Sequence, residues 1–191
     1  TLCTPETPHR ILICMNAGIG NAVETTPLIQ ACKMLWPYAQ ICIWGPRGDL
    51  FDNWCLVEKW FFTETDVKEA APYFRIYFAT VSKDLDVRRF RQYGPVEKRE
   101  LRISSIHVKP EAEYYMDLVR WEGYKGPTPS LYVSIKDPDI GSLPGHPRIA
   151  ILPGGKGDRG WRHKHWPHFA ELTRLLLSAF ESAQIYIIRT R

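Results

Sequence analysis

The 191-residue sequence lacks several features that would assign a protein class at once. No run approaches the roughly 18 apolar residues that a membrane-spanning helix needs, and residues 1–9 lack the basic and apolar regions of a signal peptide. The five cysteines form no Cys-x-x-Cys pair, and Cys14 and Cys42 fall inside apolar runs. We therefore expect buried free thiols and a cytoplasmic protein rather than a disulfide-bonded one.

Two nucleotide-binding motifs are also incomplete. The run 18–23 lacks the third glycine of the dinucleotide fingerprint, which disfavours a dehydrogenase, and the run 155–157 lacks the Gly-Lys-Ser/Thr of a P-loop, which disfavours an NTPase. A net charge of +4 is only mildly basic. It argues against nucleic-acid binding, although two tryptophans are interleaved with basic residues within 159–168, and it slightly favours anionic substrates or a membrane surface.

Three histidines, His163, His165 and His168, lie close together in the sequence. No cysteine or carboxylate joins them at metal-ligand spacing, and Pro167 separates their backbone contexts. We predict no metal site here, and the same residues suit a solvated basic loop.

What the sequence does contain is a glycine-rich turn between a strand pattern and a helix pattern. Residues 11–15 form a continuous apolar run, which is typical of a strand buried on both faces of a parallel sheet. The turn that follows holds Gly18 and Gly20, and a helical segment then ends near residues 36–37. A helix that begins beside such a turn directs backbone N–H groups towards an anion such as a phosphate. The two glycines alone also suit a plain tight turn.

The first part of the chain continues as alternating strands and helices. Strands are predicted at 40–44, 57–63 and 75–80, a short helix at 50–56 and a longer helix at 110–121. Helical spacing puts Tyr114, Leu118 and Trp121 near one face of the longer helix. The aromatic run 60–62 is predicted to belong to the core rather than to an acceptor platform.

A second unit follows a segment rich in glycine and proline. We predict an N-terminal Rossmann-like domain over 1–126, a linker over 127–147, and the start of a second domain over 148–191. Within that second domain, strands at 149–152 and 184–188 flank a helix at 167–180. A self-standing parallel α/β domain needs more strands than these, so we expect the second domain to be incomplete.

Two motifs together resemble the heptosyltransferase-like glycosyltransferases of family 9, which have the GT-B fold. Gly18-Ile-Gly-Asn-Ala-Val-Glu-Thr-Thr-Pro-Leu-Ile resembles the first loop and helix of that family, whose pattern is Gly-x-x-Gly-Asp followed by Thr-x-Pro-Leu. Pro153-Gly-Gly followed by Lys164-His-Trp-Pro-His-Phe-Ala-Glu-Leu resembles its second hallmark. Residues 107–126 between them are similar to the interdomain helix, so the resemblance covers nearly the whole chain.

The resemblance implies an α/β, GT-B-like fold and inverting, metal-independent glycosyl transfer without a cofactor. The donor is expected to be a nucleotide-sugar of the ADP-heptose type, and the acceptor a lipopolysaccharide core or another glycan. A base deprotonates the acceptor hydroxyl, and cationic groups neutralise the leaving diphosphate. Lys164 matches the phosphate-binding lysine of the family, and Gly154, Gly155 and Lys156 are expected beside it. Peripheral contact with the inner membrane is left open.

The chain departs from the family at the position of the catalytic base, where Asn21 replaces an aspartate. A neutral amide can orient a hydroxyl but cannot take its proton, and asparagine is also a common helix N-cap. Glu24 becomes a candidate base if Asn21 starts the helix, because the two would then share a face. If Thr26-Pro27 starts the helix instead, Glu24 sits in the turn.

Two other hypotheses stay open at this point. The chain could be a non-catalytic fragment or descendant that binds a glycan or a protein, which Asn21 and the incomplete second domain both favour. It could also be an unrelated nucleotide-binding α/β protein. In either GT-B case, a partner chain could complete the second domain.

Overall fold

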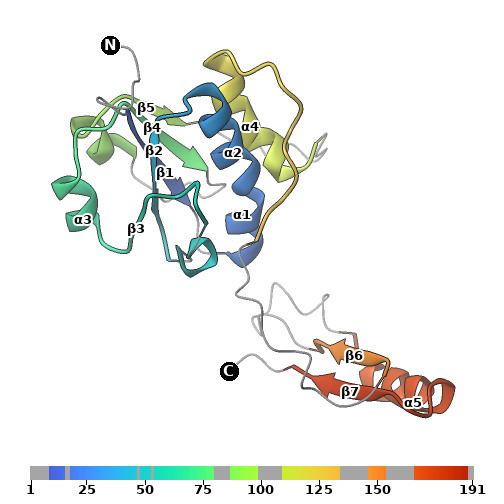
Figure 1. The fold of residues 1–191 in the computed structure, drawn as a ribbon. Coiled ribbons are helices and arrows are strands. Elements are labelled where there is room, and N and C mark those ends of the chain that lie inside the picture. The colour runs from blue at the N-terminus through green and yellow to red at the C-terminus, as the bar shows by residue number, and fades with distance from the viewer. Residues whose placement is uncertain are drawn as a thin grey trace. The chain divides into compact units, whose positions relative to one another are not determined.

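The first unit of the chain is built on a parallel five-stranded sheet with the order β3-β2-β1-β4-β5 (Figure 1). The strands are β1 (Arg10–Met15), β2 (Gln40–Trp44), β3 (Lys59–Phe61), β4 (Arg75–Ala79) and β5 (Val96–Lys98). The computed structural model describes residues 9–15, 18–46, 48–52, 54–79, 87–98, 109–133, 146–153 and 166–188. The two units of the chain are Thr1–Lys136 and Asp137–Arg191, and their boundary falls inside the segment predicted to be a linker.

The central strand β1 is buried on both faces, as its continuous apolar run predicts. Ile11 and Ile13 face one core together with residues of α1 (Ile19–Glu24), α2 (Thr26–Leu35) and α4 (Glu111–Trp121). Leu12 and Cys14 face the opposite core, which includes Val67 of α3 (Glu64–Glu69). Side chains of a strand alternate between the two faces, so a strand covered on both sides must be apolar at every position.

The opposite face also carries a 3₁₀ helix, η2 (Val87–Gln92), whose Phe90 is fully buried against β4. The helix α3 begins with a capping box: the Thr63 hydroxyl accepts a hydrogen bond from the Asp66 N–H at 3.3 Å, and the Asp66 carboxylate accepts one from the Thr63 N–H at 3.1 Å. These bonds satisfy two of the backbone donors that a helix N-terminus leaves free.

The predicted first helix is broken into α1 and α2 at Thr25. Pro27 has no N–H, so it cannot donate to the carbonyl of Val23 four residues earlier, as a helix requires. The Thr26 hydroxyl donates to that carbonyl instead, at 2.7 Å, and the Thr25 hydroxyl donates to the carbonyl of Asn21 at 2.8 Å. Side-chain hydroxyls therefore satisfy the carbonyl groups at the break, and both threonines are buried.

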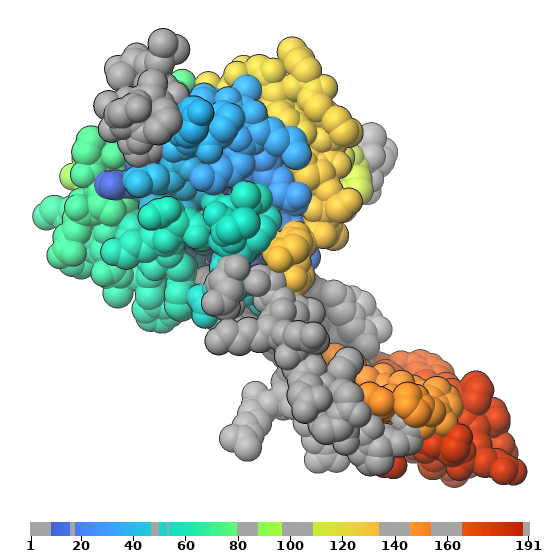
Figure 2. All heavy atoms as spheres, viewed as in Figure 1, coloured from blue at the N-terminus to red at the C-terminus, as the bar shows by residue number. Residues whose placement is uncertain are grey.

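The segment that follows α4, residues 127–133, lies against α2; we call it the strap (Figure 2). Gln30 donates to the carbonyl of Ser130 at 2.7 Å, and the Tyr132 N–H donates to the Thr26 hydroxyl at 2.9 Å. The ring of Tyr132 stacks on Trp54 with centroids 4.7 Å apart. The first residues of the predicted linker are therefore packed on the first unit.

Several sequence predictions need correction. The helix expected at 50–56 is only a 3₁₀ turn, η1 (Gly48–Phe51), and α3 and β5 were not expected. On α4, the face predicted to group Tyr114, Leu118 and Trp121 is not the buried one. Trp121 is 78% exposed, because the helix buries Ala112, Tyr115, Met116, Leu118 and Val119. In the aromatic run 60–62, Phe61 is buried, whereas Phe62 is exposed.

The second unit contains the parallel pair β6 (Arg148–Ile151) and β7 (Gln184–Ile187), connected through α5 (Phe169–Ala179). This is the predicted strand–helix–strand order, with boundaries within two residues of those expected. Of the described residues in this unit, only Ile151 is buried, and α5 buries none. Large apolar side chains are exposed there, namely Leu152, Leu175, Leu177, Phe180, Ile187 and Ile188.

The cysteines behave largely as their positions predict. Cys14, Cys32 and Cys42 are free and buried, whereas Cys55 is free and exposed; Cys3 lies outside the described residues. Among the residues that the structure describes, no helix is long and apolar enough to cross a membrane.

Candidate functional site

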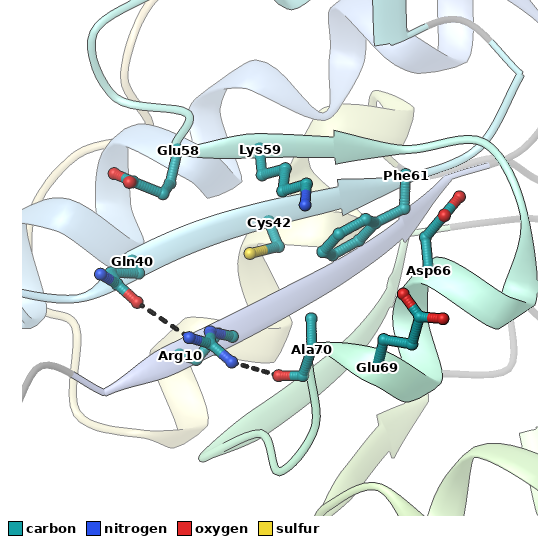
Figure 3. A pocket seen from close by; sticks show the side chains of 9 residues that line it. All are labelled: Arg10, Gln40, Cys42, Glu58, Lys59, Phe61, Asp66, Glu69 and Ala70. Atoms are coloured by element: carbon teal, nitrogen blue, oxygen red, sulfur yellow. Dashed lines mark hydrogen bonds between the residues drawn. The ribbon is translucent and has the colours of Figure 1, made fainter.

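The first unit has a pocket of about 440 Å³ at the amino-terminal ends of its strands (Figure 3). Arg10, Gln40 and Lys59, the first residues of β1, β2 and β3, line it together with Asp66 of α3. Arg10 already bonds the Ala70 carbonyl and lies 3.5 Å from the Gln40 side-chain oxygen, and Asp66 caps its own helix. Arg10, Gln40 and Asp66 thus already have partners within the fold. This pocket also lies at the sheet edge opposite the glycine-rich turn.

The glycine-rich turn lies at the other edge, where the strand order reverses. From β1 the chain crosses to β2 on one side, while β4 pairs with β1 on the other side, with Met15 opposite Ala79. In open parallel sheets, ligands bind outside the carboxyl ends of the strands at such a switch point. The turn therefore stands where this architecture normally places a ligand.

The two glycines of the turn differ in their surroundings. Gly18 has an extended backbone, with φ −79° and ψ 138°, and a β-carbon there would collide with Oδ1 of Asn21. A β-carbon on Gly20 would meet no atom within 4 Å. Gly18 is thus needed for the close approach of Asn21, whereas Gly20 faces open space.

Asn21 is the third residue of α1, and Gly18 is the N-cap. The interpretation of Asn21 as an N-cap is therefore wrong, and the helix starts two residues before it. Its side-chain Nδ2 donates a hydrogen bond to Oε1 of Glu111, the first residue of α4. Glu24 is the last residue of α1, so it lies in the helix and not in the turn, three residues after Asn21.

Glu111 receives a second hydrogen bond, from the hydroxyl of Tyr115 one helical turn later. Both donors reach the same carboxylate oxygen, Oε1. The Tyr115 side chain is buried, and its pKa is raised by that burial and by its bond to Glu111. Glu111 is therefore the common acceptor that joins Asn21 of α1 to Tyr115 of α4.

Glu24 completes the group, which we call the four-residue cluster: Asn21, Glu24, Glu111 and Tyr115. Burial raises the pKa of Glu24, and the charge of Glu111 and a hydrogen bond with it raise that pKa further. Its Oε2 atom is buried and has no hydrogen-bond partner among the described residues. A carboxyl group with a raised pKa can accept and release a proton nearer to neutral pH than an ordinary glutamate.

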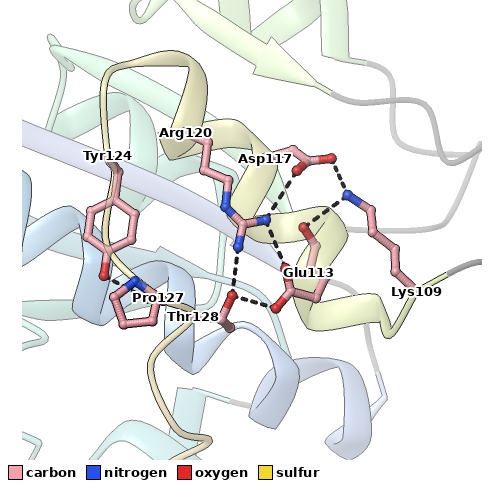
Figure 4. Close-up of polar contacts among 7 residues, drawn as sticks. All are labelled: Lys109, Glu113, Asp117, Arg120, Tyr124, Pro127 and Thr128. Carbon is pink, nitrogen blue, oxygen red and sulfur yellow. Dashed lines mark hydrogen bonds and ion pairs between the residues drawn. The ribbon is translucent and has the colours of Figure 1, made fainter.

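The helix that carries Glu111 and Tyr115 is fixed on its outer side by a network of charges (Figure 4). Arg120 contacts Glu113 at 2.8 Å, Asp117 at 3.4 Å and the Thr128 hydroxyl of the strap at 2.8 Å. The bond from Thr128, followed by that from Arg120, lowers the pKa of Glu113. These contacts tie the strap to α4 and hold the helix in place beside α1.

Glu111 and Tyr115 were not identified from the sequence. The sequence carries one signal that could have located them, because a helix that follows a parallel strand begins at the carboxyl edge of the sheet. The first turns of α1 and α4 therefore lie at the same edge, and polar residues of both can meet there. A carboxylate as the first residue of α4, with a tyrosine four residues later, fits that reasoning.

The residues predicted for the donor side lie outside the described part of the chain. They are Gly154, Gly155, Lys156 and Lys164, and two of the three histidines lie outside it as well. The third, His168, is exposed and lies 3.4 Å from Glu171. In the described part of the chain, no group of three or more histidine, cysteine or acidic side chains is arranged to hold a metal ion.

No protein-family model and no curated protein sequence matches the chain. Solved structures do match its fold. The fold is GT-B-like. One match is ADP-heptose LPS heptosyltransferase II of E. coli, with a TM-score of 0.68 and 19% identity over 93% of this chain and 63% of that one. A second is E. coli heptosyltransferase WaaC with ADP, with a TM-score of 0.66 and 17% identity over 95% of this chain and 68% of that one. A family 9 glycosyl transferase from Veillonella parvula also matches, with a TM-score of 0.59 and 10% identity over 94% of this chain and 70% of that one.

The chain spans between 63% and 70% of the length of the three structures. At 10% to 19% identity the likeness establishes the fold, and the chemistry must be argued from the residues of this chain.

Proposed function

We propose that the chain is part of a glycosyltransferase that moves a sugar from a nucleotide-sugar to a glycan acceptor. The observation that carries this proposal is the four-residue cluster at the carboxyl edge of the first sheet of a GT-B-like fold. Two of the matching structures are named as heptosyltransferases, which supports an ADP-heptose-like donor and a lipopolysaccharide-core or similar glycan acceptor. Such a reaction belongs in the cytoplasm, with the protein in peripheral contact with the inner membrane.

In the proposed reaction the acceptor binds beside α1 and the base is Glu24. The proton of the acceptor hydroxyl moves to a carboxylate oxygen of Glu24 as the hydroxyl oxygen attacks the anomeric carbon. The bond from that carbon to the diphosphate oxygen breaks, and its electron pair leaves with the diphosphate. Attack from the side opposite the leaving group inverts the anomeric configuration.

The leaving diphosphate needs positive charge, and we propose that the second unit supplies it without a metal ion. Lys164 and Lys156 provide cations, and the glycines Gly154 and Gly155 let the backbone approach the phosphates. Asn21 has no group that accepts a proton at neutral pH, and its Nδ2 is already bonded to Glu111. In this scheme it contributes to the acceptor side only by orientation.

We further propose that β6 and β7 belong to a larger sheet. Ile187 at the end of β7 is 56% exposed and Leu175 on α5 is 62% exposed, which is unusual for the apolar face of a parallel α/β unit. Additional strands, from a longer chain or from a partner chain, would cover these residues. The mass of the protein from its native source separates the two cases: a mass well above 22.1 kDa supports a longer chain.

The proposal is tested by assaying transfer and donor binding together. Purified protein is incubated with a panel of nucleotide-sugars and glycan acceptors, and release of the nucleoside diphosphate is measured. Donor binding is measured by titration calorimetry for the wild type, for Lys164→Ala, and for Lys125→Ala as a control on an exposed lysine of the first unit. We expect Lys164→Ala to weaken binding more than about tenfold, and Lys125→Ala to leave it unchanged. Equal affinity in all three proteins removes Lys164 from the donor site.

A second candidate function is a non-catalytic module that binds a glycan or a protein. The amide of Asn21 at the position of the family's catalytic aspartate favours it. Such a module would bind a glycan saturably but show no diphosphate release at high protein concentration, with every donor tested. Turnover that depends on Glu24 would exclude it.

A further inference from the structure

We propose that Glu111 is a positioning residue for Asn21. It binds the Nδ2 end of the amide, so that Oδ1 is left beside the glycine-rich turn to accept a hydrogen bond from a hydroxyl group of the acceptor glycan. The use of Oδ1 by a glycan rests on the glycosyl transfer proposed above, whereas the fixed orientation of the amide does not. In this assignment position 21 selects the acceptor, while Glu24 takes the proton of the reacting hydroxyl.

The first support is that the hydrogen bonds allow only one orientation of the amide. Asn21 Nδ2 and the Tyr115 hydroxyl both donate to Oε1 of Glu111. The hydroxyl has a single proton, and that proton is used in its bond to Glu111. A flipped amide would place Oδ1 against Oε1, and two acceptor atoms would face each other without a proton between them. The carboxyl group therefore determines which end of the amide points away from α4.

The second support is the place of the other end of the amide. Oδ1 lies so close to Gly18 that a β-carbon there would collide with it. Within the described part of the chain, no group donates a hydrogen bond to this oxygen, and Asn21 is only half-buried. A β-carbon on Gly20 would meet no atom within 4 Å, so there is open space beside the turn. Oδ1 is therefore an acceptor with room for a ligand next to it.

The third support is that Glu111 is itself held in place. The hydroxyl of Tyr115 binds it from one helical turn later, and the Tyr115 ring is buried in the core. On the outer side of α4, Arg120 donates to the Thr128 hydroxyl of the strap at 2.8 Å. A group can orient its neighbour only when its own position is fixed by packing and hydrogen bonds. Tyr115 and the strap supply that support for Glu111.

The chemistry of Oδ1 defines the group that it can select. An amide oxygen accepts hydrogen bonds and cannot donate them, so its partner must carry a proton. In the reaction proposed above, the reacting hydroxyl gives its only proton to Glu24. We therefore assign Oδ1 to a second hydroxyl, on a carbon near the reacting one. Asn21 and Glu24 are three residues apart on α1, which puts their side chains on one face of the helix. The arrangement thus fits a sugar with adjacent hydroxyl groups.

The orientation is tested by NMR of the side-chain amide, which needs no activity. The chain has three asparagines, Asn16, Asn21 and Asn53, so protein labelled with nitrogen-15 at asparagine gives a sparse spectrum, and Asn21→Ser assigns the signals. We expect one Nδ2 proton of Asn21 to exchange with water about tenfold more slowly in the wild type than in Glu111→Ala. Glu111→Gln, whose side-chain oxygen still accepts, should keep the slow exchange. Equal exchange in the wild type and Glu111→Ala overturns the positioning role.

A control and a second measurement accompany these variants. Glu69→Ala removes an exposed carboxyl group from α3 and should leave the Asn21 signals unchanged. Where Glu111→Ala fails to fold, Tyr115→Phe keeps the ring in the core and removes only the hydroxyl that fixes Glu111. We expect exchange of the Asn21 amide to become faster in Tyr115→Phe, and unchanged exchange there overturns the proposal. Wild-type exchange as fast as in a free asparagine amide overturns it without any variant.

Selection of the acceptor is tested with the glycan of the panel above that gives turnover, and with derivatives that each lack one hydroxyl. Loss of the hydroxyl that Oδ1 binds should raise the KM of the glycan about tenfold or more in the wild type. In Asn21→Ala, which has no Oδ1, the glycan and that derivative should have equal KM values. Glu111→Ala should behave like Asn21→Ala, and Glu111→Gln like the wild type.

Two readouts separate this role from a general loss of structure and from failure of the proposed function. The KM for the nucleotide-sugar should stay the same in Asn21→Ala and Glu111→Ala, which partial unfolding would not allow. If every deoxy derivative affects the wild type and Asn21→Ala alike, the assignment of Oδ1 to a glycan hydroxyl is wrong. Absence of turnover in the wild type with every donor overturns the proposed function, while the amide exchange still decides the orientation.

Discussion

Asn21 and Glu111 are 90 residues apart in the sequence, and a hydrogen bond from Nδ2 to Oε1 joins them. The bond links the first turn of α1 to the first residue of α4, two helices that lie on the same face of the sheet. Because α1 has only six residues, its own backbone bonds fix it weakly. Its position therefore depends on α4, and so does the position of Glu24.

Glu24→Gln is expected to stabilise the protein at neutral pH. The pKa of Glu24 is raised in the folded state, so its contribution to stability is fully present below its unfolded pKa and is lost as the pH rises through the folded value. Glutamine imitates the neutral form at every pH. Urea unfolding should give equal stability for variant and wild type below about pH 4, and a more stable variant at neutral pH. A pH profile of Glu24→Gln that runs parallel to that of the wild type would contradict the raised pKa.

Gly18→Ala and Gly20→Ala should have opposite effects. The methyl group at position 18 collides with Asn21 Oδ1, so the amide must move and its bond to Glu111 is lost; we expect a loss of about 1–3 kcal/mol. Position 20 has no atom within 4 Å, and alanine in a helix restricts the unfolded chain, so a gain of about 0.4–1 kcal/mol is expected. Both changes in stability are measured as the difference in the free energy of unfolding in urea between variant and wild type. Equal effects of the two substitutions would show that the contact at Gly18 carries no energy.

Thr63→Ala tests the start of α3. It removes the hydroxyl that accepts from the Asp66 N–H, and loss of such a cap costs about 1 kcal/mol. Thr65→Ala, on an exposed residue two positions later in the same helix, is the matched control and should change stability little. Amide hydrogen exchange should show faster exchange within residues 64–69 only for Thr63→Ala. Similar exchange in both variants would mean that the capping box does not hold the helix.

Thiol labelling tests the burial of the cysteines. Burial raises the pKa of Cys42 to about 11 and also raises the pKa values of Cys14 and Cys32. The thiolate is the reactive form, so in a Cys3→Ser background at neutral pH a maleimide should label exposed Cys55 at least about 100-fold faster than the other three. Peptide mapping by mass spectrometry measures the rates. In urea all four should react alike, and rapid labelling of Cys42 in the folded protein would contradict its burial.

The parts of the fold that the sequence predicts are those with long and regular patterns. The apolar run of β1 and the boundaries of β2 and α4 are correct to within one residue. The helix α3 and the strand β5 were missed because elements of six and three residues are too short for a clear periodicity. The break at Thr25 follows from Pro27, whose missing N–H is visible in the sequence.

The site is predicted only in part, for a different physical reason. Gly18, Asn21 and Glu24 lie within one short stretch, and their local motif shows in the sequence. Glu111 and Tyr115 enter the cluster because α4 docks beside α1, and no local pattern records that contact. The buried face of α4 also differs from the face that the spacing singled out: the pattern grouped Tyr114, Leu118 and Trp121, whereas the helix buries Tyr115 and Met116.

The strap also has a mechanical consequence. The hydroxyl of Thr26 holds the carbonyl of Val23 and the N–H of Tyr132 at the same time. The strap is therefore anchored two residues after Glu24, at the point where α1 gives way to α2, and removal of that single hydroxyl would release both contacts at once.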